Sequence, residues 1–352
     1  MRIKQLAPAL IAAMAPMSVP AAEAEIYGLF HLSADYLNAD DGDPLNVNTG
    51  DEGATISSNS SRLGFRGNTA ISDALSAIWQ VEIEVYADNG SALSTDRNTF
   101  AGLRGNWGQV RAGRFDTPFK LLHSRTSLFS DQVGDGRNIL RADAADGLTT
   151  TTDSNWWNER LRNSIAYQTP TWNNLQANLH YSSNQDAGAA TSSQQASWSA
   201  SVEWNRENVW LAAAHEDSSK VIGGVLTERQ ASRLALSWTL GDSRLTGLYQ
   251  RADNPDIDAW GAGIKHNITD KLALKTHYYR LDATGQNQDA ELFAIGMDYA
   301  IAKALMFYGT YGQVVNGDAI NRDPWSQGRN DDLVTGNGDT PDAVSAGMIY
   351  RF

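Results

Sequence analysis

Cysteine is absent from this sequence of 352 residues, so disulfide bonds and thiolate metal sites are excluded. Long hydrophobic runs are missing as well. Past residue 22, no uncharged apolar stretch approaches the ~20 residues that a transmembrane helix requires. The mean hydropathy is −0.41, which together with this absence excludes a helical membrane protein. A membrane β-barrel is still allowed, because only every second residue of its strands faces lipid.

Positive charge is scarce relative to negative charge. The sequence has 28 Lys and Arg residues against 41 Asp and Glu residues, which gives a formal net charge of −13. Such an acidic chain is a poor binder of nucleic acid, so we expect no nucleic-acid partner. If the protein encloses a pore, its net charge favours cations mildly at long range, although the narrowest point of a pore dominates its selectivity.

The first two dozen residues differ from the rest. Two basic residues open the sequence, a mostly apolar stretch follows over residues 6–19, and Ala22-Glu23-Ala24 fits a small-x-small cleavage site. This pattern predicts a secretory signal peptide over residues 1–24, which leaves a mature chain of residues 25–352. Removal of this segment takes away two cations and Glu23 and changes the formal charge to −14.

The mature sequence is dominated by alternation with a period of two. Around residue 80, Trp79, Val81 and Ile83 fall on one face, whereas Glu82 and Glu84 fall on the other. Strands of about ten residues with apolar and polar faces are typical of a membrane barrel with an aqueous lumen. In a soluble β-sandwich the apolar face would pack on a second sheet, whereas here the face with two carboxylates suits an aqueous lumen.

Sixteen such segments follow one another along the chain. We expect them to start near residues 26, 54, 75, 97, 107, 161, 174, 195, 208, 229, 243, 257, 271, 290, 303 and 342. An even number suits a single-chain bacterial barrel, and sixteen strands enclose an open channel rather than a packed core. The predicted fold is therefore all-β, a 16-stranded antiparallel transmembrane barrel.

The connections between these segments alternate between short turns and longer polar loops. Short turns face the periplasm in such barrels, and long loops face outward. The connection from about Phe115 to Arg160 is much longer than most of the others. A connection of this length predicts a functional loop rather than a simple linker.

The carboxyl end alternates in the same way and stops on an aromatic residue. Val344, Met348, Tyr350 and Phe352 share one face of the final segment. A last strand that ends in Phe, with an aromatic residue two positions earlier, resembles the signal read by the barrel-assembly machinery. Tyr350 and Phe352 are therefore our candidates for an assembly signal.

Several motifs resemble the Gram-negative general porin family. Ile26-Tyr27-Gly28-Leu29-Phe30 is similar to the first strand of that family, and Ser61-Arg62-Leu63-Gly64-Phe65-Arg66-Gly67 to its second strand. The stretch Gly108-Gln109-Val110-Arg111-Ala112-Gly113-Arg114-Phe115-Asp116 and the later Arg162-Asn163-Ser164-Ile165-Ala166-Tyr167 are similar too. The resemblance spans the mature chain.

The resemblance implies both a structure and a function. It implies an outer-membrane homotrimer in which the long third loop, residues 115–160, folds into the lumen and narrows it. The implied function is passive diffusion of small hydrophilic solutes and ions, without a cofactor. Lipopolysaccharide and outer-membrane lipid would surround the barrel, and the barrel-assembly machinery would act during biogenesis.

Charged residues at inward positions are the candidate selectivity residues. Alternation places Arg62 and Arg66 on one face of their strand and the apolar Leu63 and Phe65 on the other. The arginine face should point into the lumen, because arginine on the lipid face costs ~2–4 kcal/mol at mid-membrane. The resemblance implies that loop acids face wall arginines and set up a transverse field. The candidates are wall residues Arg62, Arg66, Arg104, Arg111 and Arg114, loop acids Asp116, Asp131, Asp135, Asp143 and Asp146, and lumen acids Glu82 and Glu84.

Three other functions are less well supported by the sequence. An outer-membrane hydrolase would need a nucleophile with its base, and no Gly-x-Ser-x-Gly elbow occurs, so we expect no enzyme. Four of the six histidines lie on separate predicted strands without ligand spacing, so we expect no metal site. They are His31, His180, His266 and His277. A substrate-specific channel would show an inward aromatic track or many inward lysines. Few lysines fall on inward positions, with Lys275 and Lys265 the candidates.

Overall fold

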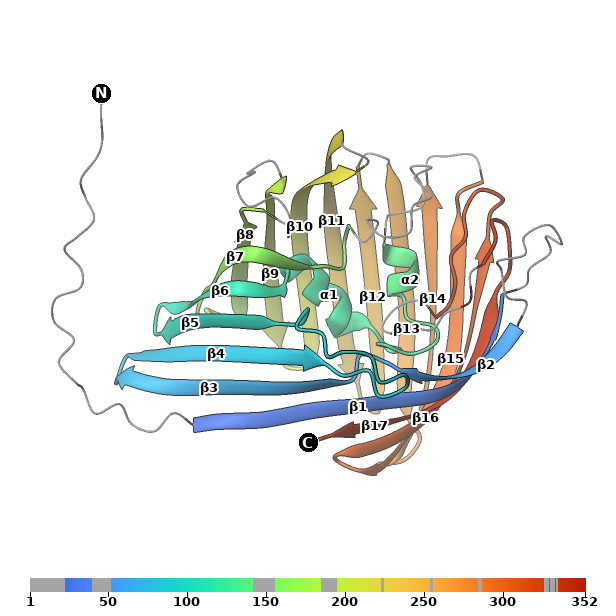
Figure 1. Ribbon diagram of the computed structural model, residues 1–352, viewed down its shortest axis with the longest axis horizontal. Helices are drawn as coiled ribbons and strands as arrows, with labels where there is room; N and C mark the ends of the chain where they lie inside the picture. The colour runs from blue at the N-terminus through green and yellow to red at the C-terminus, as the bar shows by residue number, and fades with distance from the viewer. Residues whose placement is uncertain are drawn as a thin grey trace.

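Figure 1 shows the computed structural model of the chain. The structure describes residues 23–39, 52–141, 156–184, 195–222, 225–253, 256–283, 287–325, 329, 333 and 335–352. The predicted signal peptide, apart from its last two residues, lies outside the described residues. The candidate loop acids Asp143 and Asp146 lie outside them as well.

The described residues form seventeen strand segments in one antiparallel sheet. The segments are β1 (Glu23–Asn38), β2 (Glu52–Ser58), β3 (Arg62–Ser72), β4 (Leu75–Glu84), β5 (Thr99–Gly105), β6 (Gly108–Asp116), β7 (Arg160–Gln168), β8 (Leu175–Ser182), β9 (Ser197–Arg206), β10 (Val209–Ile222), β11 (Val225–Leu240), β12 (Ser243–Ala252), β13 (Ile257–Asn267), β14 (Leu272–Ala283), β15 (Ala290–Ala302), β16 (Leu305–Asn316) and β17 (Asp342–Arg351).

Segments β2 and β3 are two halves of one strand. Both pair with β1, β2 along its second half and β3 along its first half. Between them Ser60 has a φ of 53°, and the amide of Asn59 still donates to the carbonyl oxygen of His31 at 2.8 Å. The barrel therefore has sixteen strands, and the predicted count is confirmed. Each strand begins within a few residues of its predicted start.

The barrel closes where β17 pairs with β1. At this seam the amide of Gly28 donates to the carbonyl oxygen of Phe352 at 2.8 Å, and the amide of Phe352 donates back at 3.2 Å. The ring of Phe352 stacks between Phe30 and Tyr350, with centroid distances of 6.0 and 5.9 Å. A side chain at position 28 would collide with the Phe352 ring in this position, so glycine lets the ring lie over the strand.

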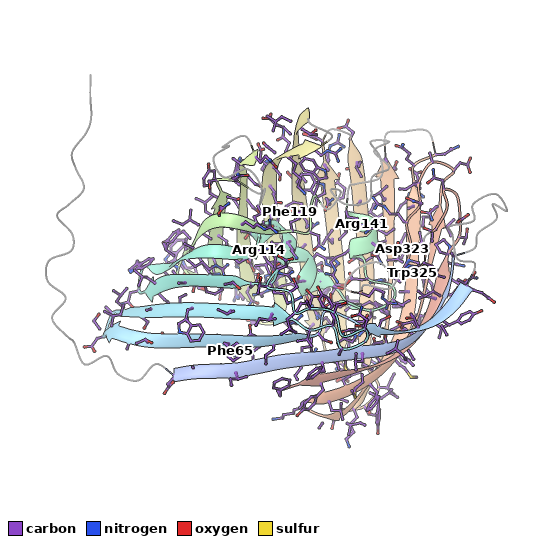
Figure 2. All side chains as sticks on the ribbon, viewed as in Figure 1. Phe65, Arg114, Phe119, Arg141, Asp323 and Trp325 are labelled. Atoms are coloured by element: carbon purple, nitrogen blue, oxygen red, sulfur yellow. The ribbon has the colours of Figure 1, made fainter. Side chains whose placement is uncertain are left out.

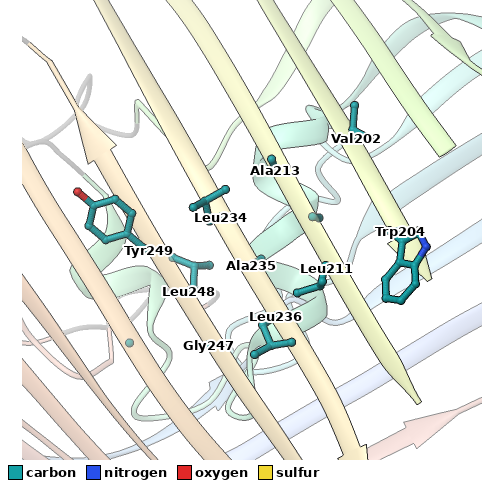
Figure 3. Close-up of a pocket in the computed structure, with 12 residues that line it drawn as sticks. Val202, Trp204, Leu211, Ala213, Leu234, Ala235, Leu236, Gly247, Leu248 and Tyr249 are labelled. Atoms are coloured by element: carbon teal, nitrogen blue, oxygen red, sulfur yellow. The ribbon is translucent and has the colours of Figure 1, made fainter. Parts of the chain in front are cut away.

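The two faces of the wall differ as the alternation predicts. On β11, Leu234 is 57% exposed on the outer face, whereas its neighbour Arg233 is 2% exposed on the inner face. Figure 3 shows the outer face over β9 to β12, where Leu211, Leu234 and Leu236 line an apolar groove. In a membrane this groove would face hydrocarbon, and the helix behind these strands lies on the opposite, inner side.

The connection between β6 and β7, residues 117–159, is called the long loop below. It contains the helices α1 (Pro118–Thr126) and α2 (Arg137–Leu140). In Figure 1 both helices lie inside the barrel, and α1 packs against β9 to β12 while α2 packs against β13 to β15. No described helix is long and apolar enough to span a membrane.

The inner wall beneath the long loop is apolar, which the alternation did not indicate. Phe119, Leu122 and Ile139 of the loop share one buried cluster with wall residues. The wall members of this cluster are mostly small or aliphatic, among them Ala212, Ala214, Ala235, Leu248, Ala252, Ala259, Leu281 and Leu292. Small inward side chains leave room for the helices, and their burial removes apolar surface from water on both sides.

Candidate functional site

The long loop is fixed to the wall by hydrogen bonds from inward side chains to the loop. Four of the bonds end on carbonyl oxygens of its backbone, one of them from Arg244 to Arg125. The guanidinium of Arg233 donates to the carbonyl oxygen of Phe119 at 2.9 Å, and the amide of Gln250 donates to that of Leu140 at 2.8 Å. Nε2 of His277 lies 2.6 Å from the carbonyl oxygen of Gly134. These bonds satisfy buried carbonyl groups that a loop in this position would otherwise leave unpaired.

Gly134 allows the loop to approach the wall closely. Its φ is 86°, and a Cβ atom there would collide with the side chain of Ala294 on β15. Both conditions favour glycine, because other residues rarely adopt this backbone conformation. Nearby, the ammonium of Lys275 donates to Oε1 of Gln132 at 2.7 Å.

The last loop, residues 317–341, holds the long loop from its other side. The amide of Gly134 donates to the carbonyl oxygen of Pro324 at 2.7 Å. Arg141 lies 3.8 Å from the carboxylate of Asp323. In Figure 2, Arg141, Asp323 and Trp325 lie close to one another beside the long loop. The long loop is therefore held between the wall and a second loop.

The described loop acids pair mainly with nearby cations rather than with the arginines of the opposite wall. Arg137 donates to Asp131 and to Asp135, each at 2.5 Å. Asp116 lies 2.8 Å from Lys120 and 3.1 Å from Arg160. Although burial raises the pKa of Asp131, Arg137 and the more distant Arg62 hold that pKa well below its usual range. All three carboxylates are thus neutralised locally.

On the opposite wall, Glu82 and Glu84 form a second group of ion pairs. Arg97, which precedes β5, lies 2.5 Å from Glu82 and 3.4 Å from Glu84. Arg62 lies 3.8 Å from Glu82, and the hydroxyl of Tyr27 donates to the same carboxylate at 2.9 Å. The sequence indicated Arg62 but not Arg97. The two inward carboxylates Glu82 and Glu84 need a cation nearby, and this need could have indicated Arg97 as their partner.

The remaining wall candidates have different surroundings. Arg66 pairs with Glu25 at 2.7 Å, and more than half of each side chain is exposed. Arg104 donates to the side chain of Gln109, and the guanidinium of Arg111 stacks on the rings of Phe100 and Phe115. All three arginines face inward.

Arg114 does not join this group. It follows Val110 and Ala112 on the other face of β6 and lies opposite Thr99 of β5. Its guanidinium pairs with Asp96 of the loop before β5, and Arg162 lies 3.7 Å from the same carboxylate. The structure thus separates Arg114 from Arg111, because the period of two continues through this part of β6.

A row of cations below the long loop was only partly indicated by the sequence. Arg244, Lys265 and Lys275 lie directly opposite one another on β12, β13 and β14. Asp298 on β15 lies 2.6 Å from Lys265 and 2.8 Å from Lys275. Arg244 donates to the carbonyl oxygen of Arg125 at the end of α1. Like charges on directly opposed residues destabilise a sheet, so this row is costly to the fold.

The hold on the long loop should weaken in acid. Burial lowers the pKa of His123 in α1 to about 3, against an opposing effect of Asp135. The folded loop keeps this ring neutral, whereas an unfolded histidine binds a proton below about pH 6.5. Stability should therefore fall by ~1.4 kcal/mol for each pH unit from about 6.5 towards 3.

Amide hydrogen exchange of residues 118–140 at pH 7 and pH 4.5 measures this effect. Exchange corrected for its intrinsic pH dependence should be faster at pH 4.5. In His123→Gln the difference between the two pH values should shrink, because glutamine does not titrate. An unchanged difference would show that His123 does not link the loop to pH.

Comparisons with known proteins identify the family over most of the chain. Residues 7–319 match the family model described as Gram-negative porin. The chain is 26% identical over 322 residues to outer membrane porin protein 32 of Delftia acidovorans, which covers 88% of this chain and 87% of that protein. A segment of 80 residues is 42% identical to major outer membrane protein P.IB of Neisseria sicca, over 21% of each chain.

Solved structures show the same fold. The anion-selective porin from Comamonas acidovorans superposes with a TM-score of 0.82 at 21% identity, over 94% of this chain and all of that one. OmpF from Salmonella typhi superposes with a TM-score of 0.68 at 15% identity, over 94% and 97% of the two chains.

The family and the fold indicate a channel rather than an enzyme. In the part of the chain that the structure describes, no group of three acidic or histidine residues is placed to hold a metal ion. The match over most of the sequence shows that the chain belongs to the Gram-negative porins, as an outer-membrane barrel with a water-filled channel for passive diffusion of small hydrophilic solutes and ions.

Proposed function

We propose that this porin prefers anions, and that inward-pointing cations below the long loop set this preference. The observation that carries the proposal is the row Arg244, Lys265 and Lys275, with Asp298 as its nearby carboxylate. The overall charge of the chain is −13, so the lumen opposes the charge of the whole protein.

The charges at the level of the long loop balance one another. Five cations and five carboxylates are joined by the ion pairs described above. The cations are Arg62, Arg97, Lys120, Arg137 and Arg160, and the carboxylates are Glu82, Glu84, Asp116, Asp131 and Asp135. We propose that this group narrows the pore and orients dipolar solutes, because Lys120, Asp131, Asp135 and Arg137 belong to the long loop while the other members stand on the wall and next to it, so that paired charges lie on both sides.

Below the loop the balance is lost. A second group of charged residues lies lower in the lumen, and each of its wall residues lies within five residues of a short turn at the end of its strand. The lower group comprises the cations Arg104, Arg111, Arg125, Arg244, Lys265 and Lys275 and the carboxylates Glu203 and Asp298. The inward pair Arg66 and Glu25 adds no net charge. An excess of cations in a confined lumen raises the local concentration of anions and lowers that of cations. One similar structure is itself described as an anion-selective porin.

Reversal potentials in planar bilayers test the proposal. With KCl at different concentrations on the two sides, the purified protein should give a reversal potential of the sign that chloride selectivity requires, with a chloride-to-potassium permeability ratio above one. The preference should weaken as the salt concentration rises, because salt screens the lumen charges. A ratio at or below one in dilute KCl would refute an anion preference.

We further propose the assembly and export of this chain from its sequence. Residues 1–24 would serve as signal peptide, residues 25–352 would form the barrel, and three copies would associate as a homotrimer in contact with lipopolysaccharide and outer-membrane lipid. Tyr350 and Phe352 would be read by the barrel-assembly machinery. Both side chains are exposed on the outer face of the seam, which supports this role. Separation of the unheated protein by size in mild detergent tests the trimer.

A further inference from the structure

A small niche opens into the lumen between α1 and the wall strands β6 to β9. Its volume is about 210 Å³, which is smaller than the pockets that hold drug-sized ligands. The polar side chains that line it include Arg111, Gln168, Gln176, Asn178 and Glu203 from the wall and Ser124 and Arg125 from α1. It therefore combines two guanidinium groups, three amides, a hydroxyl and one carboxylate.

Both guanidinium groups have aromatic support but unused donors. The carbon atom Cζ of Arg111 lies 5.3 Å from the centre of the Phe100 ring and 4.6 Å from that of Phe115. Cζ of Arg125 lies 5.4 Å from the centre of the Trp210 ring. Among the described residues, no oxygen accepts a hydrogen bond from either guanidinium group. Stacking fixes the planes of these groups, and their N–H edges are left for a ligand.

The other arginines nearby differ in this respect. Arg104 donates twice to the amide oxygen of Gln109, at 3.1 and 3.0 Å. Arg244 donates to the hydroxyl of Ser237 at 3.0 Å and to the backbone of Arg125. In each of them Nε and one terminal nitrogen donate within the protein, so this edge of the guanidinium group is occupied. Unused donors are thus a property of the niche rather than of every lumen arginine.

The carboxylate of the niche is already satisfied by neutral donors. Glu203 accepts from Nδ2 of Asn178 and from Nε1 of Trp210, each at 3.0 Å. Its nearest approach to Arg125 is 3.9 Å, which is longer than a hydrogen bond. Because Glu203 does not occupy the guanidinium edges, the niche has two available cations and a net charge of one positive unit.

We infer that this niche binds small monocarboxylates with polar substituents, such as hydroxy acids, as they pass through the channel. The planar fork of Arg111 matches the two oxygens of a carboxylate, and Arg125 supplies a second donor group. The amides of Gln168, Gln176 and Asn178 suit hydroxyl or amino substituents. Glu203 disfavours a dianion such as phosphate, because the net charge of the niche, one positive unit, balances only one negative charge.

This inference rests on the proposed anion preference, and it makes the niche a weak binding site within a general pore. Binding in a channel must be favourable enough for entry and weak enough for release. The site lies on the periplasmic side of the long loop, since its wall residues sit near the short turns. A carboxylate that has passed the long loop would therefore dwell there before it leaves.

Blockade of the chloride current tests the site. Potassium lactate, added to single channels in symmetric KCl, should reduce the current along a saturable curve, whereas glycerol should not. Inorganic phosphate should need a higher concentration than lactate for the same reduction. Arg111→Gln should raise the half-blocking concentration of lactate by at least about tenfold, as expected for loss of a charge-assisted hydrogen bond. Arg111→Lys should restore only part of the blockade, because lysine lacks the fork.

Two further variants keep the result interpretable. Arg104→Gln removes the same charge from the neighbouring strand outside the niche and should raise the half-blocking concentration of lactate much less than Arg111→Gln does, because it lowers only the general attraction of the lumen for anions. Arg125→Gln changes a half-exposed residue of α1 and should reduce blockade even if Arg111→Gln does not fold. Equal effects of Arg104→Gln and Arg111→Gln, a linear response to lactate, or stronger blockade by phosphate would each overturn the site.

Reversal potentials recorded on the same channels separate the two proposals. If chloride is preferred but lactate does not saturate, the niche fails and the anion preference stands. If chloride is not preferred, the proposed function fails, and an Arg111-dependent saturable blockade would identify the niche on its own.

Discussion

Arg104→Glu combined with Arg244→Glu is expected to invert the ion preference of this channel. Both side chains face the lumen below the long loop, and neither has a carboxylate partner among the described residues. Reversal of one charge changes the energy of an ion at ~8 Å by about 1 kcal/mol in water, before screening. Two reversals should change the chloride-to-potassium permeability ratio by roughly tenfold and bring it below one.

A matched control separates the lumen from the overall charge. Arg251→Glu combined with Arg280→Glu changes the formal charge of the protein by the same amount. Both residues lie on the outer face of the barrel, on β12 and β14, near the strand ends that lie away from the short turns. Their replacement should leave the reversal potential nearly unchanged. Similar shifts for both pairs would mean that net charge, rather than lumen charge, sets the preference.

The second large effect is expected from Arg137→Ala, which should loosen the long loop without unfolding the barrel. Arg137 neutralises Asp131 and Asp135, and the side chain of Asp135 is fully buried. Removal of one partner of a buried ion pair costs ~3–5 kcal/mol, because the remaining charge loses its compensation. The strand pairing does not depend on this residue, so the cost should fall on the loop.

Single-channel recording measures the outcome. The conductance of Arg137→Ala should rise and the open channel should become noisier, because a loop that leaves the wall widens the pore and fluctuates. Arg280→Ala, which breaks partly exposed pairs with Asp289 and Glu291 on the outer face, should change neither quantity. A quiet Arg137→Ala channel of wild-type conductance would show that other contacts hold the loop.

The wall of the barrel could be predicted from the sequence, because each strand carries its own pattern. Alternation at Trp79 and Glu82, or at Leu234 and Arg233, depends on residues next to each other in the chain. The pattern therefore gave the sixteen strands and the face of nearly every wall candidate. The C-terminal alternation likewise placed Tyr350 and Phe352 on the outer face.

The ion pairs could not be predicted, because the fold decides which charged residues lie close enough to pair. Asp135 belonged to the loop in any reading, yet its pairing with Arg137 rather than with a wall arginine follows from the path of the loop backbone. Arg125 belonged to no strand and had no periodic signal. The row of Arg244, Lys265 and Lys275 depends on the register of three strands, which the spacing of residues in the chain does not determine.

The apolar inner wall has a consequence for reading related sequences. In this barrel, small apolar residues at inward positions, such as Ala212, Ala214 and Ala235, mark where the long loop packs on the wall. The same pattern in a strand of a related porin would indicate the contact area of its loop. The same stretch cannot be distinguished from a lipid face by hydropathy alone. Combined with the strand register, the pattern of small inward residues would show which part of the wall the loop covers. The open pore would then lie along the remaining wall, in family members for which only the sequence is known.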